Sequence, residues 1–177
     1  MNSTALYIAM QPLIILIILL LLFTSFIVYI VNKVGVLESI SDSFYEMKEQ
    51  GSLFWVALTS MAFLLVLFAP QNPYLLISAA GLVFTCGSPY FKEAFPDKPI
   101  HFAGAVTAIL SAFVNLYVSY ELWQPFALFV VGVGLIALFR VKNHTWWVEV
   151  WAFYLIIVGM LVGEVLKLLK NDVLHCF

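Results

Sequence analysis

The sequence predicts an all-α protein, a polytopic transmembrane bundle of six helices plus one interfacial amphipathic helix. Hydrophobic residues make up 64% of the 177 residues and charged residues only 10%, which is far from the balance of a soluble domain. The hydrophobic residues also fall in runs separated by short turns. Because the turns leave no room for a separate soluble domain, we expect residues 1–177 to form a single membrane domain.

The first apolar run covers residues 9–31. It is long enough to cross a hydrocarbon core of about 30 Å at about 1.5 Å per residue. A cleavable signal peptide would begin with basic residues, and residues 1–11 contain no Lys or Arg. We therefore expect a permanent membrane anchor.

Prolines divide the rest of the apolar sequence into further spans. Pro70 and Pro73 cannot donate to a helix and disfavour helix in the residue before them, so a hairpin is expected there. Pro125 suits the first turn of a helix. The spans expected after the anchor are residues 53–69, 74–90, 101–120, 125–139 and 145–169.

The only long polar segment, residues 36–50, lies between the first two spans. Its apolar residues recur at helical spacing, namely at Leu37, Ile40, Phe44 and Met47. The opposite face of that helix would carry the acids Glu38, Asp42, Glu46 and Glu49. We expect an amphipathic helix in the membrane interface with its apolar stripe against the acyl chains.

The basic residues predict the orientation. Six of the eight Lys and Arg residues fall in the loops after spans one, three and five: Lys33, Lys48, Lys92, Lys98, Arg140 and Lys142. By the positive-inside rule these loops face the cytoplasm and both termini lie outside. The expected location is a membrane, most simply the bacterial inner membrane.

The same three loops and the adjoining helix ends supply the residues with plausible chemistry. His101, His144 and Glu149, with Asp97, offer the nitrogen and oxygen ligands that zinc accepts. The alternative is that both histidines are interfacial polar residues at helix starts. Glu149 is flanked by tryptophans and apolar residues, so it should face the bundle interior and have a partner, for which His101 and Arg140 are the natural candidates.

The acidic face of residues 36–50 suggests a contact surface for a protein partner. The residues expected on it are Glu38, Asp42, Tyr45, Glu46 and Glu49. The alternative is a charge-balanced cap, in which cations such as Lys92 neutralise the acids and lock the loops together. A net charge of −2 argues against nucleic acid as the partner.

Gly159 and Gly163 form a small-xxx-small pair in the sixth span. Such pairs allow two helices to approach closely, here either inside the bundle or between two copies of the chain.

Short motifs carry a resemblance to a known family. An anchor helix is followed by SISDSFY (39–45), then by FPDKPIH (95–101), then by an acid early in the sixth span. This order resembles a family of uncharacterised bacterial six-helix membrane proteins that has been compared with the superfamily of alkaline ceramidases and progestin/adipoQ receptors. The resemblance implies a zinc ion acting on lipid amide bonds, with Ser41 and Asp97 as catalytic residues and His101 beside them at the zinc. The HxxxH of that superfamily's last helix is absent here.

Three functions follow as expectations. The first is an integral membrane protein that acts by binding, as an accessory subunit or a lipid- or partner-docking component, in the bilayer with a protein partner or as a homo-oligomer; it needs no cofactor. The second is an interfacial metal-dependent lipid amide hydrolase that uses zinc. The third is an oligomeric channel or transporter, against which the middle spans carry almost no ionisable residues.

Overall fold

The computed structural model describes residues 3–47, 51–68, 71–88, 90, 92 and 96–174. Within these residues the chain forms seven α-helices, one short 3-10 helix and no strand. In chain order the elements are α1 (Ser3–Val34), η1 (Ile40–Asp42), α2 (Ser43–Glu46), α3 (Ser52–Phe68), α4 (Pro73–Gly87), α5 (Asp97–Tyr120), α6 (Gln124–Leu138) and α7 (His144–Leu174).

Each of the six predicted spans overlaps one of the long helices. Three of these, within α1, α5 and α7, are long and apolar enough to cross a membrane, while α3, α4 and α6 are apolar but shorter, at 17, 15 and 15 residues. A helix of 15 residues is only about 22 Å long, less than the hydrocarbon thickness. The all-α class is confirmed, and six complete crossings stay a prediction.

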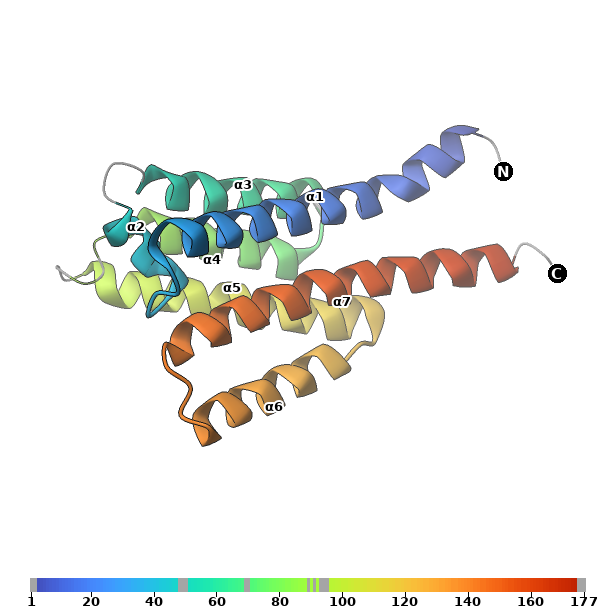
Figure 1. Ribbon diagram of the computed structural model, residues 1–177. Helices are drawn as coiled ribbons and strands as arrows, with labels where there is room; N and C mark the ends of the chain where they lie inside the picture. Colours follow the sequence, from blue (N-terminus) through green and yellow to red (C-terminus); the bar gives the residue numbers. More distant parts are fainter. Residues whose placement is uncertain are drawn as a thin grey trace.

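Five helices pack side by side around a common core. α1 contacts α3, α3 contacts α4, α4 contacts α5, α5 contacts α7, and α7 returns to α1 (Figure 1). The core between them is aliphatic and aromatic, with Leu16, Phe23, Leu116 and Met160 almost fully buried. α6 lies outside this group, mainly against α7, and none of its residues is buried.

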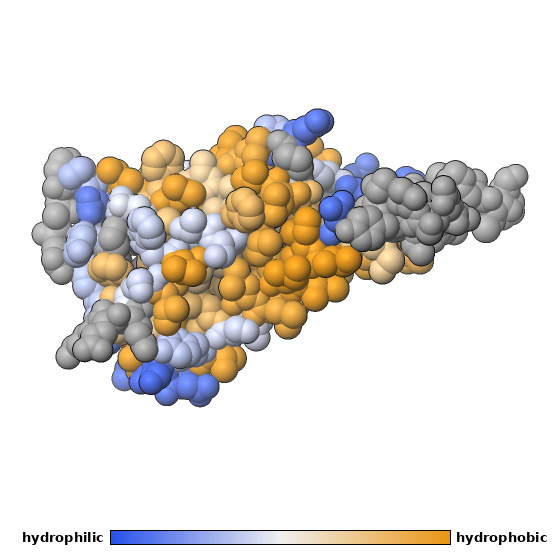
Figure 2. All heavy atoms as spheres, turned by 90° about the horizontal axis from the view of Figure 1, so that it is seen from above, coloured by the Kyte–Doolittle hydropathy of each residue, from blue (hydrophilic) through white to orange (hydrophobic). Residues whose placement is uncertain are grey.

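The start of α1 and the end of α7 lie at one end of the bundle, and η1 and α2 lie at the other (Figure 1). The surface view shows a broad hydrophobic band between hydrophilic residues at its two ends (Figure 2). This distribution is typical of a protein that crosses a bilayer.

A close approach of α4 and α5 fixes the geometry of the polar end. A Cβ on Gly81 would lie 2.6 Å from the carbonyl oxygen of Gly104, and a Cβ on Gly104 would lie 2.8 Å from the amide nitrogen of Thr85. Only glycines allow this spacing. It brings the last turn of α4 against the first turns of α5.

The predicted amphipathic helix over residues 36–50 is wrong in its described part. Residues 36–39 are not helical, and the next seven form the 3-10 helix η1 and one turn of α-helix, α2. Residues 48–50 lie outside the described part of the chain. We call residues 36–47 the cap segment, because they cover the polar end of the bundle.

Tertiary contacts explain why the cap segment does not form one regular helix. The cap segment turns several polar groups towards the bundle, and Ser41, Asp42 and Ser43 are all buried. Contacts with α5 and α7 outweigh the preference for a regular helix that the spacing of the apolar residues indicated.

Candidate functional site

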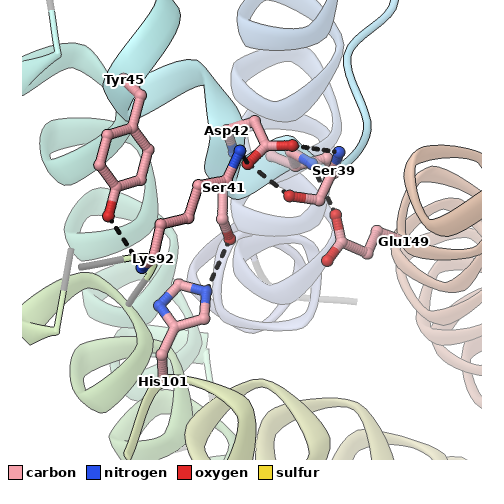
Figure 3. A network of polar contacts seen from close by, with 8 residues as sticks. Ser39, Ser41, Asp42, Tyr45, Lys92, His101 and Glu149 are labelled. Atoms are coloured by element: carbon pink, nitrogen blue, oxygen red, sulfur yellow. Dashed lines mark hydrogen bonds and ion pairs between the residues drawn. The ribbon is translucent and has the colours of Figure 1, made fainter. Parts of the chain in front are cut away.

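A cluster of polar side chains lies between the cap segment and the ends of α4, α5 and α7. Figure 3 shows its members, which are Ser39, Ser41, Asp42, Tyr45, Lys92, His101 and Glu149. They come from four parts of the chain, so the cluster exists only in the folded bundle.

A capping box shapes the cap segment. The amide of Asp42 donates to the Ser39 hydroxyl oxygen at 3.3 Å, and the amide of Ser39 donates to a carboxylate oxygen of Asp42 at 3.0 Å. The two bonds satisfy amides at the start of a helix that have no partner within it. They hold η1 in one conformation and so fix the direction of the Ser41 side chain.

His101 lies in the second turn of α5 and reaches the end of α4. Its Nδ1 lies 2.8 Å from the carbonyl oxygen of Thr85 and 3.2 Å from that of Ser88. Carbonyl oxygens in the last turn of a helix accept no hydrogen bond from an amide of that helix, so they are available to this nitrogen. Because a carbonyl oxygen only accepts, Nδ1 of the neutral ring carries the hydrogen.

The other ring nitrogen of His101 meets Ser41. The Ser41 Oγ and the His101 Nε2 are 2.8 Å apart. With the hydrogen on Nδ1, Nε2 is the acceptor and the Ser41 hydroxyl is the donor. Both residues are buried, at 6% and 3% exposure. The result is a serine hydroxyl bonded to an imidazole that two carbonyls orient.

Glu149 approaches the cap segment from α7. One of its carboxylate oxygens accepts a hydrogen bond from the amide of Ile40 at 2.6 Å. The partners expected from the sequence were His101 and Arg140, but the structure gives this backbone amide. The amide of Trp146, in the first turn of α7, also donates to the Glu38 carbonyl at 2.9 Å. The cap segment and α7 thus satisfy each other's backbone groups.

Asp42 and Lys92 form an ion pair at the edge of the cluster. The Lys92 Nζ lies 2.6 Å from Asp42, whose side chain is 5% exposed, while that of Lys92 is 43% exposed. The hydrogen bond to Asp42 raises the pKa of Lys92 above its ordinary value. The backbone amide of Lys92 donates to the Tyr45 hydroxyl at 3.1 Å. This pairing follows the charge-balanced cap that the sequence suggested as an alternative.

The acidic residues predicted to form a partner surface do not share one face. Glu38 and Glu46 are exposed and Tyr45 is half-buried, but Asp42 is buried and paired. Including Asp42 in an exposed acidic face was therefore wrong. Glu49 lies outside the described residues.

The predicted zinc ligands are not gathered. His144 is exposed at the start of α7, whereas His101 is buried against the cap segment. Over the described ranges, no group of three or more His, Cys, Asp or Glu side chains could hold a metal ion. Zinc binding stays a prediction.

Asp97 was predicted as a catalytic residue beside Ser41. It is the first residue of α5 and half-buried, and its carboxylate makes no hydrogen bond or ion pair to another described residue. Pro99 falls in the first turn of α5, where its missing amide hydrogen has no cost, so Asp97 and His101 lie on one continuous helix.

Gly159 and Gly163 lie on the face of α7 that packs inside the molecule. A Cβ on Gly159 would lie 3.0 Å from the Leu116 side chain, and one on Gly163 would lie 2.3 Å from the Tyr120 ring. Both neighbours belong to α5. The glycines therefore serve close packing within the chain.

Sequence reasoning missed the roles of three contributors to the cluster. Ser39 was not assigned its capping role, although the spacing Ser39-x-x-Asp42 resembles a capping box. Thr85 and Ser88 contribute only backbone carbonyls, which no side-chain pattern marks.

Comparisons with models of known protein families, with curated proteins and with solved structures found no match for this chain. The resemblance to the ceramidase superfamily therefore stays a prediction.

Proposed function

We propose that this chain is an integral membrane serine hydrolase that cleaves an acyl bond of a lipid, with Ser41 as the nucleophile and His101 as the base. The observation that supports this is the 2.8 Å hydrogen bond between Ser41 Oγ and His101 Nε2, together with the carbonyls of Thr85 and Ser88 at Nδ1. A nucleophile, a base and a group that orients the base are the elements of covalent acyl transfer.

In the first step the Ser41 oxygen attacks the carbonyl carbon of the substrate while His101 Nε2 takes the hydroxyl proton. The imidazolium then gives that proton to the leaving oxygen or nitrogen, and the acyl group stays on Ser41 as an ester. The carbonyls of Thr85 and Ser88 act as the orienting group, because they hold the ring in the tautomer that accepts at Nε2.

The proposed substrate class is a lipid because of where the site lies. The cluster lies at one end of a bundle that carries a broad hydrophobic band on the face shown in Figure 2. A lipid in the adjoining leaflet would present an ester or amide carbonyl at the boundary between acyl chains and headgroups. Since Ser41 is buried, the substrate has to displace part of the cap segment, and we expect slow acylation.

The test is covalent labelling in native membranes with an alkyl fluorophosphonate, followed by peptide mass spectrometry. Wild-type protein is expected to carry the probe on Ser41. Ser41→Ala should abolish labelling, and His101→Gln should slow it by about 100-fold or more, the usual contribution of a positioned base. Ser43→Ala is the matched control, because Ser43 is buried two residues away and its hydroxyl has no partner among the described residues.

The second candidate is the binding role, as an accessory subunit or docking component. Glu38 and Glu46 favour it, since both are exposed on the cap segment beside the polar cluster. In that role the Ser41–His101 bond only anchors the cap segment. Wild-type protein that stays unlabelled at Ser41 under conditions that label a known membrane serine hydrolase would rule out the hydrolase and favour this candidate.

A further inference from the structure

A small cavity adjoins Ser41 on the side of Glu149. Its volume is about 30 Å³, and its polar side chains are Ser41, Thr85 and Glu149, with apolar walls that include Phe54, Leu82 and Phe153. A water molecule needs about 10–15 Å³ and two to four polar partners. The cavity therefore has the volume and the polar lining to hold one water in contact with both Ser41 and Glu149.

Glu149 is oriented for a role in this cavity. The bond from the Ile40 amide engages one carboxylate oxygen, and the second oxygen has no hydrogen bond to another described residue. Figure 3 shows the second oxygen of Glu149 on the side of the carboxylate away from its dashed hydrogen bond. The fixed oxygen holds the carboxylate in place and leaves the other able to accept a proton.

His101 does not line this cavity, although it contacts Ser41. It reaches the serine from α5, whereas Glu149 comes from α7 (Figure 3). A water in the cavity would lie beside Glu149 and Ser41 but not beside the imidazole.

We propose that this cavity is the site of the hydrolytic water and that Glu149 is the general base that removes the acyl group from Ser41. The inference rests on the proposed function. The water oxygen bonds to the acyl carbon while one water proton passes to Glu149. The bond between that carbon and the Ser41 oxygen then breaks, the serine oxygen takes the proton from Glu149, and the carboxylic acid leaves.

The division of labour gives a distinctive kinetic signature. The variant Glu149→Gln keeps an acceptor for the Ile40 amide but has no basic oxygen. With p-nitrophenyl octanoate in detergent, it is expected to release about one nitrophenolate per chain in a burst. Turnover should then be about 100-fold or more slower than in wild type, the usual contribution of a general base. Intact-mass measurement should find the octanoyl group retained on Ser41.

Two further variants sharpen the test. Ala105→Val adds volume at a residue that lines the cavity and leaves Glu149 itself unchanged, so it should also leave Ser41 acylated. Glu46→Gln removes an exposed carboxylate of the cap segment and should leave both phases at the wild-type rate.

The outcomes separate this inference from the proposed function. A burst-free Glu149→Gln with wild-type turnover, in a protein whose Ser41 still reacts with fluorophosphonate, would overturn the role of Glu149 and leave the hydrolase standing. A wild-type protein that never acylates Ser41 would overturn both. If Glu149→Gln unfolds, acyl retention in Ala105→Val decides the matter, since rapid release from it would contradict a water site in this cavity.

Discussion

At the scale of single residues, each reactive group of the cluster is held in its position and protonation form by a hydrogen-bond or ion-pair partner. An isolated Ser–His contact is common, but here the imidazole has a defined tautomer because Thr85 and Ser88 offer it two carbonyls. The ion pair between Asp42 and Lys92 plays the corresponding part for the cap segment, since Asp42 also closes the capping box that directs Ser41.

The Asp42–Lys92 pair can be tested through its pH dependence. We expect Lys92→Gln to lower the free energy of unfolding by about 1 kcal/mol at pH 7, because it removes the ion pair with Asp42. The loss is small because Lys92 is exposed and solvent screens the pair. For a protein of this size the melting temperature should fall by about 2–4 °C. The raised pKa of Lys92 means that its contribution is complete below its ordinary value of 10.5.

The difference between wild type and Lys92→Gln should therefore shrink as the pH rises through the raised pKa, above about 10.5. Thermal shift measurements in detergent from pH 7 to pH 11.5 would follow it. Lys98→Gln is the control, because Lys98 is exposed and makes no ion pair with a described residue. An unchanging difference across this range would show that the ion pair does not contribute.

At the scale of elements, the close contact of α4 with α5 sets the position of His101. Gly104→Ala would place a Cβ 2.7 Å from the Gly81 carbonyl oxygen and 2.8 Å from the Thr85 amide nitrogen, and both are backbone atoms that cannot rotate away. We expect a loss of about 1–3 kcal/mol in stability, the usual cost of overpacking. Separation of α4 from α5 should also slow fluorophosphonate labelling of Ser41.

Gly134→Ala is the matched control for this substitution. A Cβ on Gly134 meets nothing within 4 Å, and alanine favours helix over glycine by about 1 kcal/mol. Its unfolding midpoint and its labelling rate should equal or exceed those of wild type. Equal effects of the two alanines would mean that the α4–α5 spacing is not what positions His101.

The long helices and the cap segment differ in how well the sequence predicts them. The six long helices were predictable because apolar runs bounded by prolines and polar turns depend only on local sequence. The cap segment was not, because its conformation depends on His101 and Glu149, which lie about 60 and 109 residues away from Ser41 and Ile40. Ser41, His101 and Glu149 were named from the sequence, but the contacts between them, and the roles of the Thr85 and Ser88 carbonyls, required the fold.

At the scale of the whole molecule, the site lies at the end of the bundle opposite the two termini (Figure 1). If all six helices cross the bilayer, the cap segment is cytoplasmic and the termini are outside, as the distribution of Lys and Arg predicts. α6 is the helix on which this arrangement depends most, because it has 15 residues and lies outside the group of five packed helices.

A pair of single cysteines tests whether α6 crosses. In a chain with Cys86→Ala and Cys176→Ser, we expect Glu121→Cys, before α6, to react with a membrane-impermeant maleimide added outside cells whose membrane is sealed. Lys142→Cys, after α6, should react only once that membrane is permeabilised. Both positions are exposed in the protein, so access depends on the membrane. If the two cysteines react from the same side, α6 does not cross and the numbers of loops on the two faces change. The cap segment would stay beside His101, because that contact does not involve α6.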